Sequence, residues 1–296
     1  MKQLLKILSA AVLAGLSFSA LASGGGGHLP NDDMPNYSGD RLTISMQKGL
    51  QVYMNNCMGC HSLKFQRYNR TAKDLEIPES LMIEHVLFTG DKIADYMSNT
   101  MPKASAENWF GTAPPDLSLI ARSRGTHWLY NYLRGFYADD SRPYKVNNSV
   151  FKDVGMPHAL ETLQGLQAKT DQVKALENDI AYAFGDIATA RGEIKDGKNV
   201  SDNNKNISEA EHLIHEKELE LVELSQQGKY FTLVKQGELS SEEFDSSMAD
   251  LVNFLEYIGE PIKRERQGMG IYVLLFILFF SAVAYLLKKE YWKDIH

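Results

Sequence analysis

The segment Cys57-Met58-Gly59-Cys60-His61 contains both cysteines of this 296-residue chain and places a histidine directly after the second. Two thiols three positions apart, followed at once by an imidazole, form the attachment site of a c-type haem. The thiols can form thioethers to the two vinyl groups of the porphyrin, and His61 then becomes an axial ligand of the iron. The segment therefore predicts one covalently attached haem c.

Other uses of a cysteine pair are less well supported by the surrounding sequence. A thioredoxin-like redox pair lies in a βαβ unit, and residues 40–75 show no such pattern. A structural zinc site needs two more ligands at similar spacing, and the sequence has no further cysteine. A disulfide between Cys57 and Cys60 remains an alternative.

The start of the chain predicts export. Lys2 and Lys6 precede an apolar run that ends in Ala20-Leu21-Ala22, as in a secretory signal peptide with cleavage after Ala22. The alternative is an uncleaved anchor, in which the glycines at 24–27 form a tether. Both interpretations place the bulk of the protein outside the cytoplasm; the family resemblance described below implies that this compartment is the bacterial periplasm.

Near the other end, residues 269–287 form 19 consecutive positions without a charge. At 1.5 Å per residue, such a helix just spans a hydrocarbon core of about 30 Å. A buried core helix is the alternative, but no polar face interrupts the run. Together with the signal peptide, the run predicts a single-pass inner-membrane protein with its C-terminus in the cytoplasm. Interfacial residues follow the run directly: Lys288, Lys289, Tyr291, Trp292 and Lys293.

The intervening sequence predicts a mainly α protein, because apolar residues recur at helical spacing and no convincing set of strands is found. Asp116 is expected to be the N-cap of a helix at 117–122. Helices at 163–194 and 208–225, joined by a polar link, predict an antiparallel hairpin, and Ser208 and Glu211 have the spacing of a capping box. The net charge of −7 argues against nucleic acid and suits a basic soluble electron carrier as partner.

The second axial ligand decides what the haem can do. An open position would allow peroxidase-type chemistry, whereas a methionine sulfur gives an electron-transfer centre of relatively high potential. Met101-Pro102 and Met156-Pro157 are both compatible in spacing, although most methionines only pack in cores. Gly155 mildly favours Met156, because glycine permits an unusual backbone approach.

Several segments, in this order, resemble cytochrome c1, the haem subunit of the bacterial bc1 complex (ubiquinol:cytochrome c oxidoreductase). They cover most of the chain apart from residues 165–235, where the family would return more directly to its anchor. The segments are CMGCHS (57–62), APPDLSLIARSRG (113–125), YLRGFYADDSRPYKVNN (132–148), VGMPHAL (154–160), DLVNFLEYIGEP (250–261) and a terminal anchor ending in LLKKEYWKDIH.

The resemblance implies that His61 and Met156 are the axial pair and that Pro114 and Pro115 lie against the haem. It also implies that Arg124 lies near a haem propionate, where a guanidinium pairs well with a carboxylate; an ordinary surface charge is the alternative. A c-type cytochrome domain with long ordered loops is expected. The implied division of the chain is a signal peptide (1–22), haem domain (23–164), inserted hairpin (165–235), return helix and linker (236–268), transmembrane helix (269–287) and cytoplasmic tail (288–296).

The resemblance further implies an electron-transfer subunit without catalytic residues of its own, embedded in membrane lipid and belonging to a dimeric complex. Its implied partners are cytochrome b, a Rieske iron–sulfur protein that donates the electron, and a soluble or tethered cytochrome c that accepts it. The alternative function is an independent membrane-anchored monohaem cytochrome that feeds a terminal oxidase.

Overall fold

The computed structural model describes residues 34–293, and helices dominate it, with 60% helix and 9% strand. The predicted mainly α class is therefore confirmed. The predicted signal peptide, residues 1–22, lies outside the described residues.

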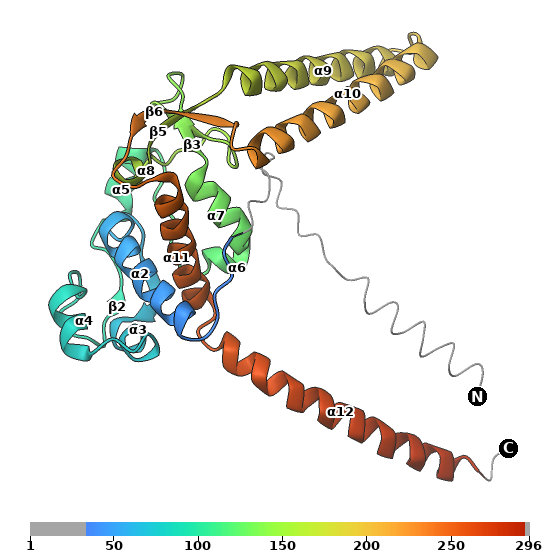
Figure 1. Cartoon of the computed structure of the whole chain (residues 1–296). Helices are drawn as coiled ribbons and strands as arrows, with labels where there is room; N and C mark the ends of the chain where they lie inside the picture. Colours follow the sequence, from blue (N-terminus) through green and yellow to red (C-terminus); the bar gives the residue numbers. More distant parts are fainter. Residues whose placement is uncertain (1–33, 294–296) are drawn as a thin grey trace.

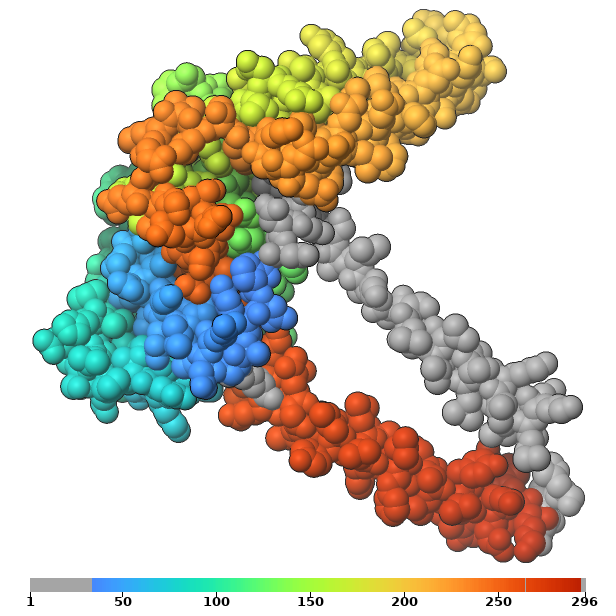
Figure 2. Space-filling model, viewed as in Figure 1, coloured from blue at the N-terminus to red at the C-terminus, as the bar shows by residue number. Residues whose placement is uncertain are grey.

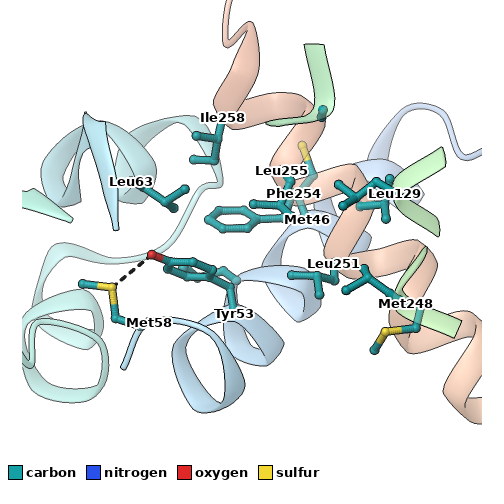
Figure 3. Close-up of a cluster of buried hydrophobic side chains, with 14 of the residues drawn as sticks. Met46, Tyr53, Met58, Leu63, Leu129, Met248, Leu251, Phe254, Leu255 and Ile258 are labelled. Carbon is teal, nitrogen blue, oxygen red and sulfur yellow. Dashed lines mark hydrogen bonds between the residues drawn. The ribbon is translucent and has the colours of Figure 1, made fainter. Parts of the chain in front are cut away.

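Two long helices, α2 (Asp40–Asn56) and α11 (Ser241–Gly259), lie side by side in the centre of the domain (Figure 1). Gly49 permits their close approach, because a Cβ there would lie 2.1 Å from the carbonyl oxygen of Asp250. Tyr53 and Phe254 are fully buried between the helices, with ring centroids 5.8 Å apart (Figure 3). The contact joins positions about 200 residues apart in the chain and holds the helix that leads into the CMGCH segment.

Short helices and loops surround this pair. The observed elements are α3 (Tyr68–Asp74), α4 (Glu79–His85), α5 (Lys103–Phe110), α6 (Ile120–Arg124), α7 (Thr126–Arg134) and α8 (Glu161–Gln164).

The expectation of no strands is wrong in detail, because three antiparallel pairs are present. They pair β1 (Leu63–Arg67) with β2 (Tyr96–Met97), β3 (Phe136–Ala138) with β4 (Val146–Asn148), and β5 (Gly165–Lys169) with β6 (Phe231–Gln236). Strands of two to six residues are too short to show a clear alternation of apolar and polar positions.

The inserted segment forms a long helical arm that projects from the domain (Figures 1 and 2). Its helices are α9 (Asp171–Lys195) and α10 (Val200–Gln226), and the β5–β6 pair forms its base. The first helix was expected to begin at residue 163, but α9 begins at Asp171 because residues 165–169 form strand β5. The second helix begins earlier than expected, at Val200, so the link between the helices shrinks to residues 196–199. Ser208 lies inside α10 and is not a cap; the capping box of this structure is Ser240 with Glu243, at the start of α11.

The apolar stripe of the arm is largely the seam between its helices. Two small clusters fill this seam, and their buried members are Val173, Leu176, Leu221, Leu224 and Tyr230 in one, and Ala183, Ile187 and Ile214 in the other.

The C-terminal helix α12 (Lys263–Tyr291) extends away from the domain. Its segment Glu265–Tyr291 has a mean hydropathy of 2.5 in its most apolar window, and none of that window is buried within the protein. A long apolar helix without protein packing fits a membrane anchor. The buried-core alternative is therefore wrong for this segment.

Candidate haem site

The CMGCH segment continues directly from the end of α2. The backbone N–H groups of Cys60 and His61 both donate to the carbonyl oxygen of Cys57, at 3.0 and 2.8 Å. This tight turn keeps the two thiols about one helical turn apart. Both cysteines are free, so the alternative of a disulfide is not formed. Burial raises the pKa of the Cys57 thiol to about 12, and Cys60 adds to the rise.

The ring of His61 is oriented by a proline carbonyl from a distant segment. Its Nδ1 lies 2.7 Å from the carbonyl oxygen of Pro115, and a carbonyl only accepts, so the proton is on Nδ1. Nε2 is then the lone-pair nitrogen, and it makes no hydrogen bond within residues 34–293. Burial lowers the pKa of His61, which favours the neutral imidazole that a metal requires. This arrangement is that of a metal-binding histidine with its second nitrogen anchored.

Hydrogen bonds of Leu117 and Asp116 hold the Pro114-Pro115 turn against the segment that follows His61. The N–H of Leu117 donates to the carbonyl of Ser62 at 2.9 Å. The carboxylate of Asp116 accepts from the N–H groups of Lys64 and Ser118, both at 2.9 Å. Asp116 is therefore not a helix N-cap, because α6 begins at Ile120; instead, it joins the proline turn to the haem-attachment segment.

Tyr53 is a site residue that the sequence did not reveal. Its hydroxyl lies 2.6 Å from the carbonyl oxygen of His61 and 3.1 Å from the sulfur of Met58 (Figure 3). Because Tyr53 also packs on Phe254 of α11, it connects the haem-attachment segment to the helical core. Its position four residues before Cys57, on the apolar face of α2, was the available signal.

Arg124 lies beside an aromatic group at the start of α7. Its guanidinium carbon is 5.0 Å from the ring centroid of Trp128 and 5.9 Å from that of Phe151. Among the described residues it has no carboxylate partner within 4.0 Å. The charge is thus held by aromatic contacts and is available for a carboxylate of another molecule.

Met156 lies in a second apolar cluster, with Phe136, Val146 and Val154. Its sulfur is 3.4 Å from the hydroxyl of Tyr132 on α7. Tyr132 packs against both this cluster and the main core, against which Cys57 also packs. The Met156 region and the CMGCH region are thus both attached to the main core.

Two buried asparagines fix the loop that carries Met156. The side chain of Asn148 donates to the carbonyl of Tyr132 and accepts from the N–H groups of Val150 and Phe151, all at 2.8–3.0 Å. Asn147 accepts from the N–H of Asp153 at 2.8 Å. Neither asparagine was predicted from the sequence to have a role, and the one available signal was a polar pair shortly before the loop of the proposed ligand.

Gly155 does not have the unusual backbone conformation that was expected of it. Its φ is not positive, and a Cβ would meet nothing within 4 Å. The left-handed residue of this loop is Asp153, with φ of 62°. Met101, the rival methionine, is half-exposed and belongs to none of the apolar clusters formed by the described residues.

These groups fit a covalently bound haem c. Cys57 and Cys60 supply free thiols at the spacing of the two thioethers, and His61 supplies an oriented neutral imidazole. Arg124 offers a guanidinium that has no carboxylate partner among residues 34–293, and Met156 offers a thioether sulfur on a hydrogen-bonded loop. No group of three or more His, Cys, Asp or Glu side chains suited to a separate metal ion occurs within residues 34–293.

Comparison with known proteins identifies related sequences over almost the whole chain. The model of the Cytochrome C1 family matches residues 39–181 and 234–295. A cytochrome c1 of Allochromatium vinosum is 39% identical, over 98% of this chain and 99% of its own length. A protein of Nitrosomonas europaea named ammonia monooxygenase gamma subunit is 35% identical, over 85% and 84% of the two chains. The residues between the two family matches, 182–233, lie mostly in the helical arm.

Proposed function

Because this chain belongs to the cytochrome c1 family, we propose that one electron passes from a Rieske iron–sulfur protein to its haem c and then to a cytochrome c. The family supports a membrane-anchored electron-transfer subunit of a bc1 complex with a covalently bound haem. The observation that carries the proposal is the His61–Pro115 contact, which presents an oriented imidazole beside the two thiols of the motif.

When bound, the haem supplies a one-electron iron couple. Cys57 and Cys60 would hold it covalently, and His61 and Met156 would be the ligands of its iron. The Pro115 carbonyl fixes the ring orientation of His61, and Asn148 fixes the loop of Met156. These contacts restrict the movement of the His61 ring and of the Met156 loop. Arg124 would pair with a propionate, and Pro114 and Pro115 would exclude water from the bound group.

The proposed setting is a dimeric bc1 complex that includes cytochrome b and the Rieske protein. The haem domain lies in the periplasm, α12 spans the membrane and the short tail is cytoplasmic. The independent-shuttle alternative is less well supported, because the similarity to a cytochrome c1 extends over 98% of the chain.

The helical arm carries the net charge of the whole chain. Residues 171–226 contain 13 Asp or Glu and 6 Lys or Arg, which gives −7, whereas the remaining 25 acidic and 25 basic residues balance. Such an asymmetric field steers a basic protein toward this side of the molecule. A basic cytochrome c as electron acceptor fits this distribution.

Gentle solubilisation and purification through a C-terminal tag test the complex. We expect a dihaem cytochrome b and a Rieske protein to co-purify with the tagged chain. Quinol added to the purified complex should then reduce its c-type haem within a single turnover. Repeated recovery of the haem protein alone, in detergents that keep other respiratory complexes intact, would contradict the proposal.

Replacing residues 171–228 by a two-residue turn tests the arm. Strands β5 and β6 already pair up to Lys169 and Phe231, so a short turn can close them. We expect an unchanged haem spectrum and, at low ionic strength, a roughly tenfold slower reduction of a basic cytochrome c, since electrostatic steering changes on-rates by about 10- to 1,000-fold.

A matched variant keeps the arm but replaces exposed carboxylates such as Asp179, Asp186 and Glu209 with amides. It should show part of the same rate loss if charge is the cause. Loss of haem on deletion would show that the arm belongs to the haem domain, and an unchanged rate in low salt would exclude the arm as the steering surface.

A further inference from the structure

Tyr132 directs its hydroxyl at the sulfur of Met156. The oxygen–sulfur distance is 3.4 Å, with the tyrosine as donor. Within the described part of the chain, this is the one hydrogen bond of that hydroxyl. Since a thioether sulfur accepts hydrogen bonds only weakly, the contact needs a well-placed donor.

Neighbouring aromatic rings fix the ring of Tyr132. It stacks on Trp128 at a centroid distance of 4.9 Å and an interplanar angle of 8°. Phe136 meets it edge-on at 5.4 Å, and the side chain of Asn148 binds its backbone carbonyl. Two aromatic neighbours therefore restrict the ring, and the fold sets the direction of its hydroxyl toward the sulfur.

A thioether sulfur has two lone pairs, so it can bind iron with one and accept a hydrogen bond with the other. The hydrogen bond withdraws electron density from the sulfur, which weakens its donation to ferric iron more than to ferrous iron. The oxidised state is then destabilised relative to the reduced state. Hydrogen bonds to axial ligands are one of the established means by which a protein tunes a haem.

We propose that Tyr132 is a positioning residue that orients the sulfur of Met156 and raises the reduction potential of the haem. The proposal rests on the proposed role of Met156 as axial ligand. It assigns to this one hydroxyl a contribution to the driving force for accepting an electron. The aromatic stack of Trp128 and Phe136 serves to hold that hydroxyl.

The test compares Tyr132→Phe with Tyr144→Phe in the full-length holoprotein. Tyr144 packs in the same cluster as Met156, but its hydroxyl donates to the carbonyl of Trp109 at 3.3 Å. Both variants remove one hydroxyl from one cluster, and only the first removes the donor to sulfur. The readouts are the equilibrium midpoint potential and the weak ferric absorption band at about 700 nm that reports a Met–iron bond.

We expect Tyr132→Phe to keep that band and to lower the equilibrium constant for electron uptake by about three- to tenfold. For a one-electron couple this corresponds to about 28–59 mV, because tenfold is about 59 mV. Tyr144→Phe should leave both readouts unchanged. An unchanged potential in Tyr132→Phe, or an equal fall in both variants, would overturn the proposal.

Loss of the band in Tyr132→Phe but not in Tyr144→Phe would also overturn the proposal. It would show that Tyr132 is needed for the Met–iron bond itself and does not adjust the potential of an intact bond. A third variant, Met156→Ala, separates this proposal from the ligand assignment. If the band survives in Met156→Ala, the assignment of the ligand itself is wrong, whatever Tyr132→Phe does.

Discussion

Met156→Ala should leave the haem covalently attached but lower its midpoint potential and open the iron to carbon monoxide. Attachment depends on Cys57 and Cys60, which this change does not touch. A methionine sulfur raises the potential of a His-ligated haem, and axial ligands shift haem potentials across about 0.8 V. We expect the midpoint potential, measured by redox titration, to fall by an amount on the order of 0.1–0.3 V. The absorption band at about 700 nm should be lost as well.

Met101→Ala is the matched control, because Met101 also precedes a proline. Its N–H donates to the side chain of Asn99 at 3.3 Å, a contact that survives truncation of its own side chain. The control should keep the potential, the band and the resistance to carbon monoxide. If Met101→Ala loses the band and lowers the potential while Met156→Ala does not, then Met101 is the axial ligand and Met156 is not.

The haem-attachment segment could be predicted from sequence because its chemistry is local. Cys57, Cys60 and His61 lie within five residues, and no tertiary contact is needed to bring them together. The two helices of the arm, α9 and α10, were also predictable, since apolar residues recur over several turns, whereas α11 was expected only from the family resemblance. Their exact ends were not, because caps and links compete over a few residues.

The supports of the site could not be predicted in the same way. The contact between His61 and Pro115 joins residues 54 positions apart, and that between Tyr132 and Met156 spans 24. Neither pair leaves a periodic signal. Asp116 illustrates the error that follows: the residue type suits a helix cap, but its carboxylate binds the N–H of Lys64 instead. The local sequence was compatible with both a helix cap and a tertiary acceptor at Asp116, and the tertiary hydrogen bond to Lys64 determined the outcome.

The ligand loop shows a related limit. Gly155 suggested a special backbone at the residue before Met156, yet the positive φ occurs at Asp153. There the carbonyl of Asp153 accepts from Arg142 at 2.8 Å, and its N–H donates to Asn147. The loop thus obtains its shape from side chains that lie up to 11 positions away, and the glycine alone did not indicate this.

Replacement of both Cys57 and Cys60 by alanine should abolish covalent haem attachment. Each thiol provides one thioether, so the single variants should retain at most one covalent bond and accumulate far less haem-bearing protein. The measurement is haem staining after denaturing electrophoresis, normalised to the amount of chain detected through a C-terminal tag. We expect at least a tenfold loss of stain in the double variant.

The two single variants are not equivalent in this structure. Cys57 is half-buried at the end of α2 and packs against the main core, whereas Cys60 is exposed. Cys57→Ala therefore removes a core contact as well as a thioether, and Cys60→Ala removes only the thioether. Cys60→Ala is thus the cleaner test of attachment, and Cys57→Ala should show the larger loss of folded protein. Normal staining of the double variant would exclude covalent attachment through this motif and, with it, a c-type haem in this chain.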